Sequence, residues 1–292
     1  MIQRLFTKWD NFFFEPKPVE SMALFRILWS SILLVYFFIE LGNIENFYGP
    51  DGMISISTAI NGINYPHLGL FQYLPTGFTS LYALLVIYFL GLMGSLIGFY
   101  TRTSLFIVLI CMTSIHQRNI WILNSAEVLM RFVTLYLMFS PCGFAFSLDS
   151  KRKAYPQEWS PWAMRLLQLQ LSVVYLWTVW HKIGGSDWID GTAVYYATRL
   201  SSFRIFTIPF LLDSILLIKV YTWGTLAIEF CLGAFLWVKE LRIPLIIMGL
   251  LFHLSLQLIL DIPFFQIIMM AMLLLFVQPE EVRALIQRFK KA

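Results

Sequence analysis

Long apolar runs, separated by short polar stretches, dominate the chain from residue 21 to residue 278. A helix needs about 20 apolar residues to cross the hydrocarbon core of a bilayer, and most of these runs approach that length. Pro and Gly mark several of their ends. The pattern therefore predicts an all-α polytopic membrane protein with about eight transmembrane helices, over residues 21–42, 80–99, 104–122, 125–147, 161–183, 219–238, 243–260 and 263–278.

The N-terminal residues predict a helix that lies on the membrane surface. Apolar side chains recur there at helical spacing beside two cations, a pattern typical of an interfacial amphipathic helix. The residues are Leu5, Trp9, Phe12 and Phe13, with Arg4 and Lys8.

Two connections between the predicted spans are long, residues 43–79 and 186–218. The first contains the turn-rich stretch 47–52. In the second, apolar spacing from Trp188 to Leu200 predicts an amphipathic helix, and residues 205–218 predict an interfacial or re-entrant segment. Because no internal repeat or linker is apparent, residues 1–292 are expected to form a single membrane domain without a soluble domain.

Composition supports the membrane assignment. Of the 292 residues, 59% are hydrophobic and 13% are charged, whereas a typical soluble domain has about 25% charged residues. The net charge of +4 is spread over short loops, which excludes a nucleic-acid-binding face. The histidines and the three cysteines lack metal-ligand spacing, and no glycine-rich phosphate loop is present.

Lysine and arginine also predict the orientation, because positive loops stay in the cytoplasm. With eight spans, both termini and every second loop lie on the same side of the membrane. That side holds most of the lysine and arginine residues. The loops of the other side hold only Arg118, Arg199 and Arg204. We therefore expect a multi-pass protein of a bacterial inner membrane with both termini in the cytoplasm.

Ionisable residues within the spans cost at least about 2.5 kcal/mol each at a helix centre, and they commonly face the bundle interior. Arg26 and Arg165 lie near cytoplasmic ends, where their side chains are expected to extend to water. The other polar residues at this depth predict a pocket that opens outward. They are His116, Arg118, Asn119, Asn124, Glu127, Arg131, Lys182, Glu229 and His253.

Lys182 is the most informative member of this set. It is followed by Gly184 and Gly185, and because no carboxylate lies within a helical turn of it, it is expected to be unpaired. A desolvated lysine loses basicity and becomes a competent base or nucleophile. The alternative is structural: buried polar groups also tie helices together by hydrogen bonds, and His253 is equally consistent with a satisfied core histidine.

With these residues identified, the chain resembles the HTTM domain, the membrane module of vitamin K-dependent gamma-carboxylases and many bacterial proteins. The resemblance runs from about residue 9 to residue 278. It rests on residues 23–27, 47–52, 116–119, Asn124 with Glu127 and Arg131, 140–141, 147–149, Lys182, 187–188, 191–196, Glu229 and 252–253.

The resemblance implies roles for individual residues. In the carboxylases, a lysine followed by a Trp and a Gly deprotonates vitamin K hydroquinone, and Lys182 stands in a similar context with one extra residue before Trp188. A carboxylase histidine on a later helix has its counterpart in His253. The resemblance thus makes Lys182 and His253 catalytic, Trp188 a pocket residue and a reduced, vitamin K-like quinone the cofactor.

Two departures argue against assigning glutamyl carboxylation. The chain ends shortly after the last predicted span, whereas the carboxylases continue into a large β-rich region. Ala126 also stands where the carboxylases have a histidine.

Three hypotheses of function follow. The first is lysine-based chemistry on a lipid-soluble quinol or an exported peptide, by a carboxylase-like or quinol-dependent modifying enzyme. The second is a non-enzymatic scaffold, toxin-maturation or immunity-type protein. It would bind an exported partner through the long connections 43–79 and 186–218, which the predicted orientation puts outside. The third is a transporter, which inverted repeats would favour.

Overall fold

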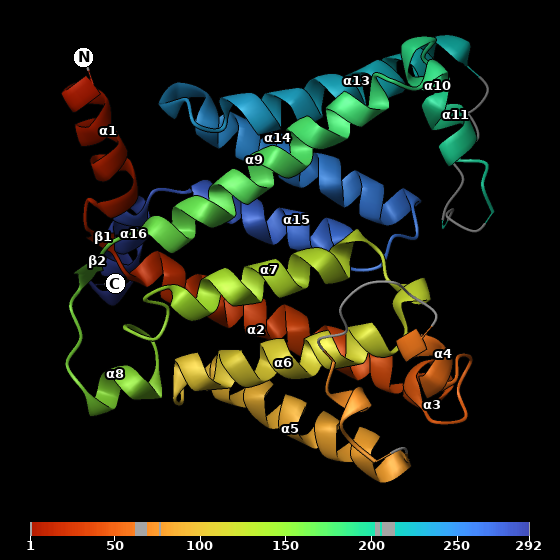
Figure 1. Ribbon diagram of the computed structural model, residues 1–292. Coiled ribbons are helices and arrows are strands. Elements are labelled where there is room, and N and C mark those ends of the chain that lie inside the picture. Colours follow the sequence, from red (N-terminus) through yellow and green to blue (C-terminus); the bar gives the residue numbers. More distant parts are fainter. Residues whose placement is uncertain (1, 62–68, 76, 202–204, 206–213, 292) are drawn as a thin grey trace. The chain divides into compact units, whose positions relative to one another are not determined.

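The computed structural model describes residues 2–61, 69–75, 77–201, 205 and 214–291. In this part of the chain the regular structure is almost entirely helical (Figure 1). The chain divides into two compact units. One comprises Met1–Arg165 with Pro279–Ala292, and the other comprises Leu166–Gln278.

In the first unit, helices α2, α5, α6 and α7 lie side by side (Figure 1). Short helices connect them, and a two-stranded antiparallel sheet pairs β1 with β2. The elements are α1 Ile2–Phe14, β1 Lys17–Pro18, α2 Glu20–Leu41, α3 Ile44–Tyr48, α4 Ile56–Asn61, η1 Leu70–Gln72, α5 Phe78–Ile97, α6 Thr101–Arg118, η2 Ile120–Ile122, α7 Ser125–Phe139, α8 Leu148–Arg152, β2 Glu158–Trp159 and α16 Pro279–Lys291.

The second unit contains most of helix α9, whose first residues belong to the first unit. Its helices pack closely because glycines face neighbouring side chains. A Cβ atom on Gly233 would lie 2.8 Å from Cγ of Leu176, and one on Gly249 would lie 2.7 Å from Cδ1 of Leu273. The elements are α9 Trp162–Lys182, α10 Ser186–Ile189, α11 Ala193–Ala197, α13 Ile215–Phe235, α14 Lys239–Ile259, α15 Phe265–Leu273 and η3 Leu274–Phe276.

Four described helices, α2, α5, α13 and α14, are long and apolar enough to cross a membrane. A fifth span would result if Phe265–Phe276 and Pro279–Phe289 form one broken span. The protein is therefore a helical membrane protein with four to five candidate spans in the described residues, and the expected eight are not shown.

The other predicted spans also form helices, but with less suitable length or composition. Helix α7 has 15 residues and ends before Ser140 and Pro141, so the predicted span 125–147 was too long. Helix α15 has only nine residues. Helices α6 and α9 have 18 and 21 residues, but both carry several polar side chains.

The long connections are partly described. In the first, α3 and α4 are short helices, and residues 62–68 and 76 lie outside the described residues. In the second, the predicted amphipathic helix is replaced by the short helices α10 and α11, because the chain turns at Gly191 with a φ of 84°. The predicted re-entrant segment falls mostly on residues 206–213, outside the described residues, and its last residues begin α13.

A helix is present where the N-terminal pattern predicted one, as α1. Its Phe13 side chain is buried, whereas Phe6 and Trp9 are exposed. Its position on the membrane surface stays a prediction. Arg165 fixes its C-terminal end to α9. Nε of Arg165 donates to the Phe12 carbonyl at 3.1 Å, and the guanidinium lies 4.7 Å from the centre of the Phe12 ring. This arginine therefore holds α1 in place.

Arg26 is the central polar contact of the first unit. It does not extend to water, as the sequence suggested, but is completely buried. Its guanidinium donates to the carbonyls of Cys142, at 3.0 Å, and Phe146, at 2.5 Å, beyond the C-terminal end of α7. These carbonyls lie outside a helix, where backbone groups need another partner. Arg26 thus fastens α2 to the segment that follows α7.

Arg26→Met should lower the stability of the protein by about 3 kcal/mol, because it leaves the buried carbonyl of Cys142 and the partly buried carbonyl of Phe146 without this donor. The unfolding temperature of the purified protein in detergent measures this effect. Arg4→Met, on the exposed side of α1, is the matched control and should have little effect. Equal unfolding temperatures for the two variants would contradict the role given to Arg26.

Candidate active site

Lys182 and Glu229 form an ion pair between α9 and α13. Nζ of Lys182 donates to Oε1 of Glu229 at 2.5 Å and to Oε2 at 2.7 Å. The Lys182 side chain is 20% exposed and the Glu229 side chain 10%. The expectation that Lys182 has no acidic partner is therefore wrong: the partner comes from another helix, 47 residues further along the chain.

The chain after Lys182 completes this centre. Helix α9 ends at Lys182, and the amide of Gly185 donates to the Lys182 carbonyl at 3.0 Å. Helix α10 follows and brings Trp188 back, so that Nζ of Lys182 lies 4.7 Å from the centre of the indole ring. A cation over an indole face is stabilised by the ring quadrupole. Lys182, Trp188 and Glu229, three of the residues selected from the sequence, therefore lie close together.

His253 occupies a second, fully buried polar cluster in the same unit. Its Nε2 lies 2.6 Å from the hydroxyl of Tyr175, and its Nδ1 lies 2.6 Å from Oε1 of Gln266. An amide oxygen accepts only, so this arrangement puts the ring proton on Nδ1, and Nε2 accepts from Tyr175. Both ring nitrogens are thus satisfied, which favours the structural interpretation of this histidine.

The two clusters are electrostatically connected. Lys182 interacts electrostatically with His253, and Glu229 interacts electrostatically with Tyr175. A neutral imidazole adds no positive charge near Lys182. The tautomer that Gln266 favours is therefore compatible with the ion pair.

A large apolar groove adjoins these helices. It has a volume of about 760 Å³ and lies between α11, α13 and α14. Its lining includes Ile228 and Phe252, which directly precede Glu229 and His253 in the chain. The few polar groups that line it are hydroxyls, such as those of Thr225 and Ser255. Such a groove suits a hydrocarbon chain.

The other predicted site residues belong to the first unit, where several have a structural task. Nη2 of Arg118 donates to the Gly49 carbonyl at 2.6 Å, and Nδ2 of Asn119 donates to the Phe47 carbonyl at 3.1 Å. Gly49 is required there, because a Cβ atom would lie 2.3 Å from the Glu45 carbonyl oxygen. Arg118 and Asn119 thus hold the turn-rich stretch against the end of α6.

Asn124 and Glu127 cap the N-terminus of α7. Oδ1 of Asn124 accepts from the amide of Ala126 at 2.7 Å, and Oε2 of Glu127 accepts from the amide of Asn124 at 2.7 Å. This is a capping box, which satisfies amides that have no partner within the helix. Glu127 also interacts electrostatically with Arg131, which lies four residues further along α7.

Unused hydrogen-bonding capacity remains near the end of α6. His116 is buried, with its Nε2 3.5 Å from the hydroxyl of Tyr36. Among the described residues, Nδ1 of His116 and two guanidinium nitrogens of Arg118 have no hydrogen-bond partner. A buried polar atom of this kind calls for a water or a ligand. Whether these residues share one pocket with Lys182 and His253 stays a prediction, since the two sets belong to different units.

The described residues thus define a helical membrane protein with a lysine–glutamate pair against a tryptophan. The HTTM domain model matches residues 14–280, and the chain belongs to the HTTM domain family. The chain is also similar to the uncharacterised protein YitO of Bacillus subtilis (strain 168), with 30% identity over 122 residues. That match covers 39% of this chain and 38% of YitO. No solved structure matches the chain.

Sequence reasoning missed two partners of His253, and it also missed the capping role of Asn124. Tyr175 and Gln266 lie far from His253 in the chain, and no sequence pattern connects them to it. The capping role of Asn124 was readable, because Asn followed three residues later by Glu before an apolar run is a helix-start signature.

A double-mutant cycle should measure the ion pair. Lys182→Met or Glu229→Gln alone should destabilise the protein by about 3 kcal/mol, because each disturbs a largely buried charge pair. The double variant should cost less than the sum of the two single variants, since no unpaired charge remains. Thermal unfolding in detergent gives the three values, and strictly additive effects would show that the two charges do not interact.

Proposed function

We propose that this HTTM-family membrane protein abstracts a proton from a lipid-soluble quinol, with Lys182 as the base. The proposal depends above all on the contact of Lys182 with both carboxylate oxygens of Glu229 beside Trp188. The resemblance of this region to vitamin K-dependent gamma-carboxylases gives the substrate class, a reduced naphthoquinone.

In the proposed reaction Glu229 accepts the proton of Lys182. Two opposite charges in an apolar surrounding pay a desolvation penalty, and transfer of one proton from Nζ to Glu229 removes both charges. The resulting neutral amine takes the proton of a quinol hydroxyl. The products are an ammonium and a quinolate, and their mutual attraction in a weakly polar surrounding stabilises the new anion.

Two features of this unit support this substrate class. The apolar groove between α13 and α14 offers room for the hydrocarbon part of a quinol. The indole of Trp188 provides a flat face beside Lys182 on which an aromatic ring can stack. His253 then has an assisting role, because it orients the hydroxyl of Tyr175 without adding charge.

Anaerobic titration with a reduced, short-chain naphthoquinol tests the proposal. Ionisation of the quinol shifts its absorption to longer wavelength, so the protein in nanodiscs should produce a quinolate signal. Lys182→Ala and Glu229→Gln should reduce the quinolate fraction or its rate of formation by roughly 100-fold, the usual contribution of a general base. The matched control is Lys219→Ala, a lysine in the first turns of α13 that does not contact Glu229.

An unchanged quinolate signal in Lys182→Ala would refute the role of the lysine. If the wild-type protein does not bind the quinol at all, the substrate class is wrong, and an exported peptide becomes the better substrate. Normal cellular function of both pocket variants, together with loss of function on deletion of loop residues between Asn43 and Thr79, would favour the non-enzymatic scaffold.

We also propose eight spans in an inner membrane, with both termini in the cytoplasm. Single cysteines in a cysteine-free background, treated with an impermeant maleimide on intact cells, distinguish this topology from one with four spans. Eight spans put positions 51 and 190 outside and positions 151 and 240 inside. If only α2, α5, α13 and α14 cross, positions 190 and 240 exchange sides.

A further inference from the structure

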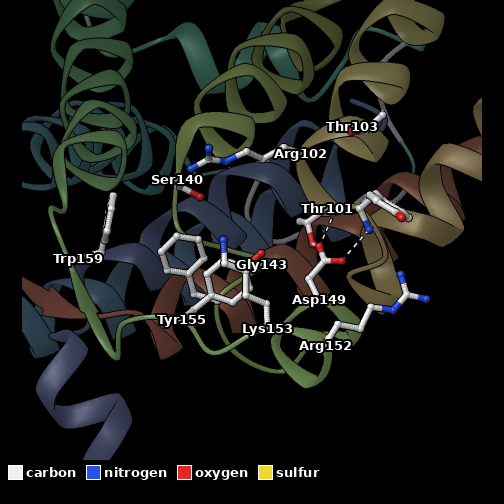
Figure 2. Close-up of a pocket in the computed structure, with 12 residues that line it drawn as sticks. Thr101, Arg102, Thr103, Ser140, Gly143, Asp149, Arg152, Lys153, Tyr155 and Trp159 are labelled. Atoms are coloured by element: carbon white, nitrogen blue, oxygen red, sulfur yellow. Dashed lines mark hydrogen bonds between the residues drawn. The ribbon is translucent and has the colours of Figure 1, made fainter.

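The first unit contains a polar cavity that the proposed quinol chemistry does not use. Its volume is about 530 Å³, and it lies between the N-terminal end of α6 and the segment that runs from Ser140 through α8 to Trp159 (Figure 2). Gly143 lies in its wall and permits a close approach there, because a Cβ atom would be 2.7 Å from Oγ1 of Thr101. The cavity is therefore formed by segments that pack tightly around it.

Positive charge predominates in this cavity. Arg102, Arg152 and Lys153 line it, against a single carboxylate, that of Asp149. Among the described residues, none of the three cations forms an ion pair within the usual distance. The cavity consequently has an excess of positive charge that other side chains do not neutralise.

Asp149 is already occupied by the start of α6. Its Oδ1 accepts from the amide of Tyr100 at 2.9 Å, and its Oδ2 accepts from the amide and the hydroxyl of Thr101, both at 2.7 Å. These contacts satisfy amides that have no partner within the helix. The carboxylate therefore stabilises the helix end rather than the cations.

Two of the cations line the cavity from different elements, Arg102 from α6 and Lys153 from the end of α8. In Figure 2 the guanidinium of Arg102 extends over Ser140, and the ammonium of Lys153 points up beside the ring of Tyr155. Nζ of Lys153 lies 5.6 Å from the centre of that ring. Arg152 is instead held at the edge of the cavity, 4.6 Å from the centre of the Phe99 ring. Arg102 and Lys153 thus both line the cavity, and neither lies in an ion pair with another described residue.

The cavity lies at one end of the helices of this unit. It adjoins the loop after α5, a candidate span, and the amide of Asp149 donates to the Gly98 carbonyl at 2.9 Å. The end of a span lies near the lipid headgroups. Tyr100 and Trp159, which also line the cavity, are exposed by 61% and 40%. Exposed Tyr and Trp are typical of this membrane level.

We propose that this cavity binds a phosphate group, with Arg102 and Lys153 as its charged ligands. A phosphate diester carries one negative charge, and a guanidinium and an ammonium both donate strongly to phosphate oxygens. The position at the end of α5 makes the headgroup of an anionic phospholipid one source of this phosphate, and free phosphate in the surrounding water is the other. Neither ligand takes part in the quinol chemistry of Lys182.

Lipid binding to the full-length protein tests the site. Native mass spectrometry of protein from nanodiscs that contain phosphatidylcholine and phosphatidylglycerol gives the retention of each lipid. Arg102→Gln and Lys153→Gln should each weaken retention of phosphatidylglycerol by roughly tenfold, since a hydrogen bond between charged groups is lost. Lys151→Gln is the matched control, because Lys151 is an exposed cation of α8 that does not line the cavity.

A second measurement distinguishes the two sources of phosphate. Inorganic phosphate is titrated into the protein in neutral detergent, and the rise in unfolding temperature is compared with the rise caused by phosphatidylglycerol. Stabilisation by the lipid alone identifies a headgroup site, and stabilisation by both identifies a general phosphate site. If Arg102→Gln and Lys153→Gln behave like Lys151→Gln in both measurements, the cavity does not bind phosphate and the inference is wrong.

Discussion

Lys182 and Glu229 are on different helices, and an apolar helix bundle can hold both charges only because they meet. Either charge alone would have to be neutralised or exposed to water. The contact fixes the end of α9 against the middle of α13. It also determines the path of the following chain, since α10 has to return Trp188 to the lysine. The proposed chemistry uses the same pair, so the element that holds these helices together also supplies the base.

The first unit meets the same constraint with different partners. Arg26 and Arg118 donate to backbone carbonyls instead of carboxylates, and these carbonyls belong to segments where the helical hydrogen-bond pattern has ended. A guanidinium is suited to this task because several donors extend from one plane. Since a carbonyl does not cancel the charge, the unit keeps buried cations that fasten loops to helix ends.

Two carboxylates of the first unit bind the free amides at helix starts. Asp149 and Glu127 lie at the starts of α6 and α7 and accept hydrogen bonds from free amides. Because these carboxylates are committed to amides, Arg102 and Lys153 near the first of them remain available to an external anion. A structural requirement of the helix end thereby leaves positive charge where a phosphate can reach it.

The sequence by itself determined the membrane class, the helices and the family, because long apolar runs permit few other structures and the family motifs run through nearly the whole chain. It also selected Lys182, Trp188 and Glu229 as site residues. It did not determine which buried groups are partners. The interpretation of Lys182 as unpaired considered carboxylates within one helical turn, whereas its partner is 47 residues away. Likewise, proximity to a helix end suggested that Arg26 reaches water, although carbonyls beyond α7 surround it. Hydrogen bonds and ion pairs act over a few ångströms in space, so the tertiary structure alone decided which helices bring these groups together.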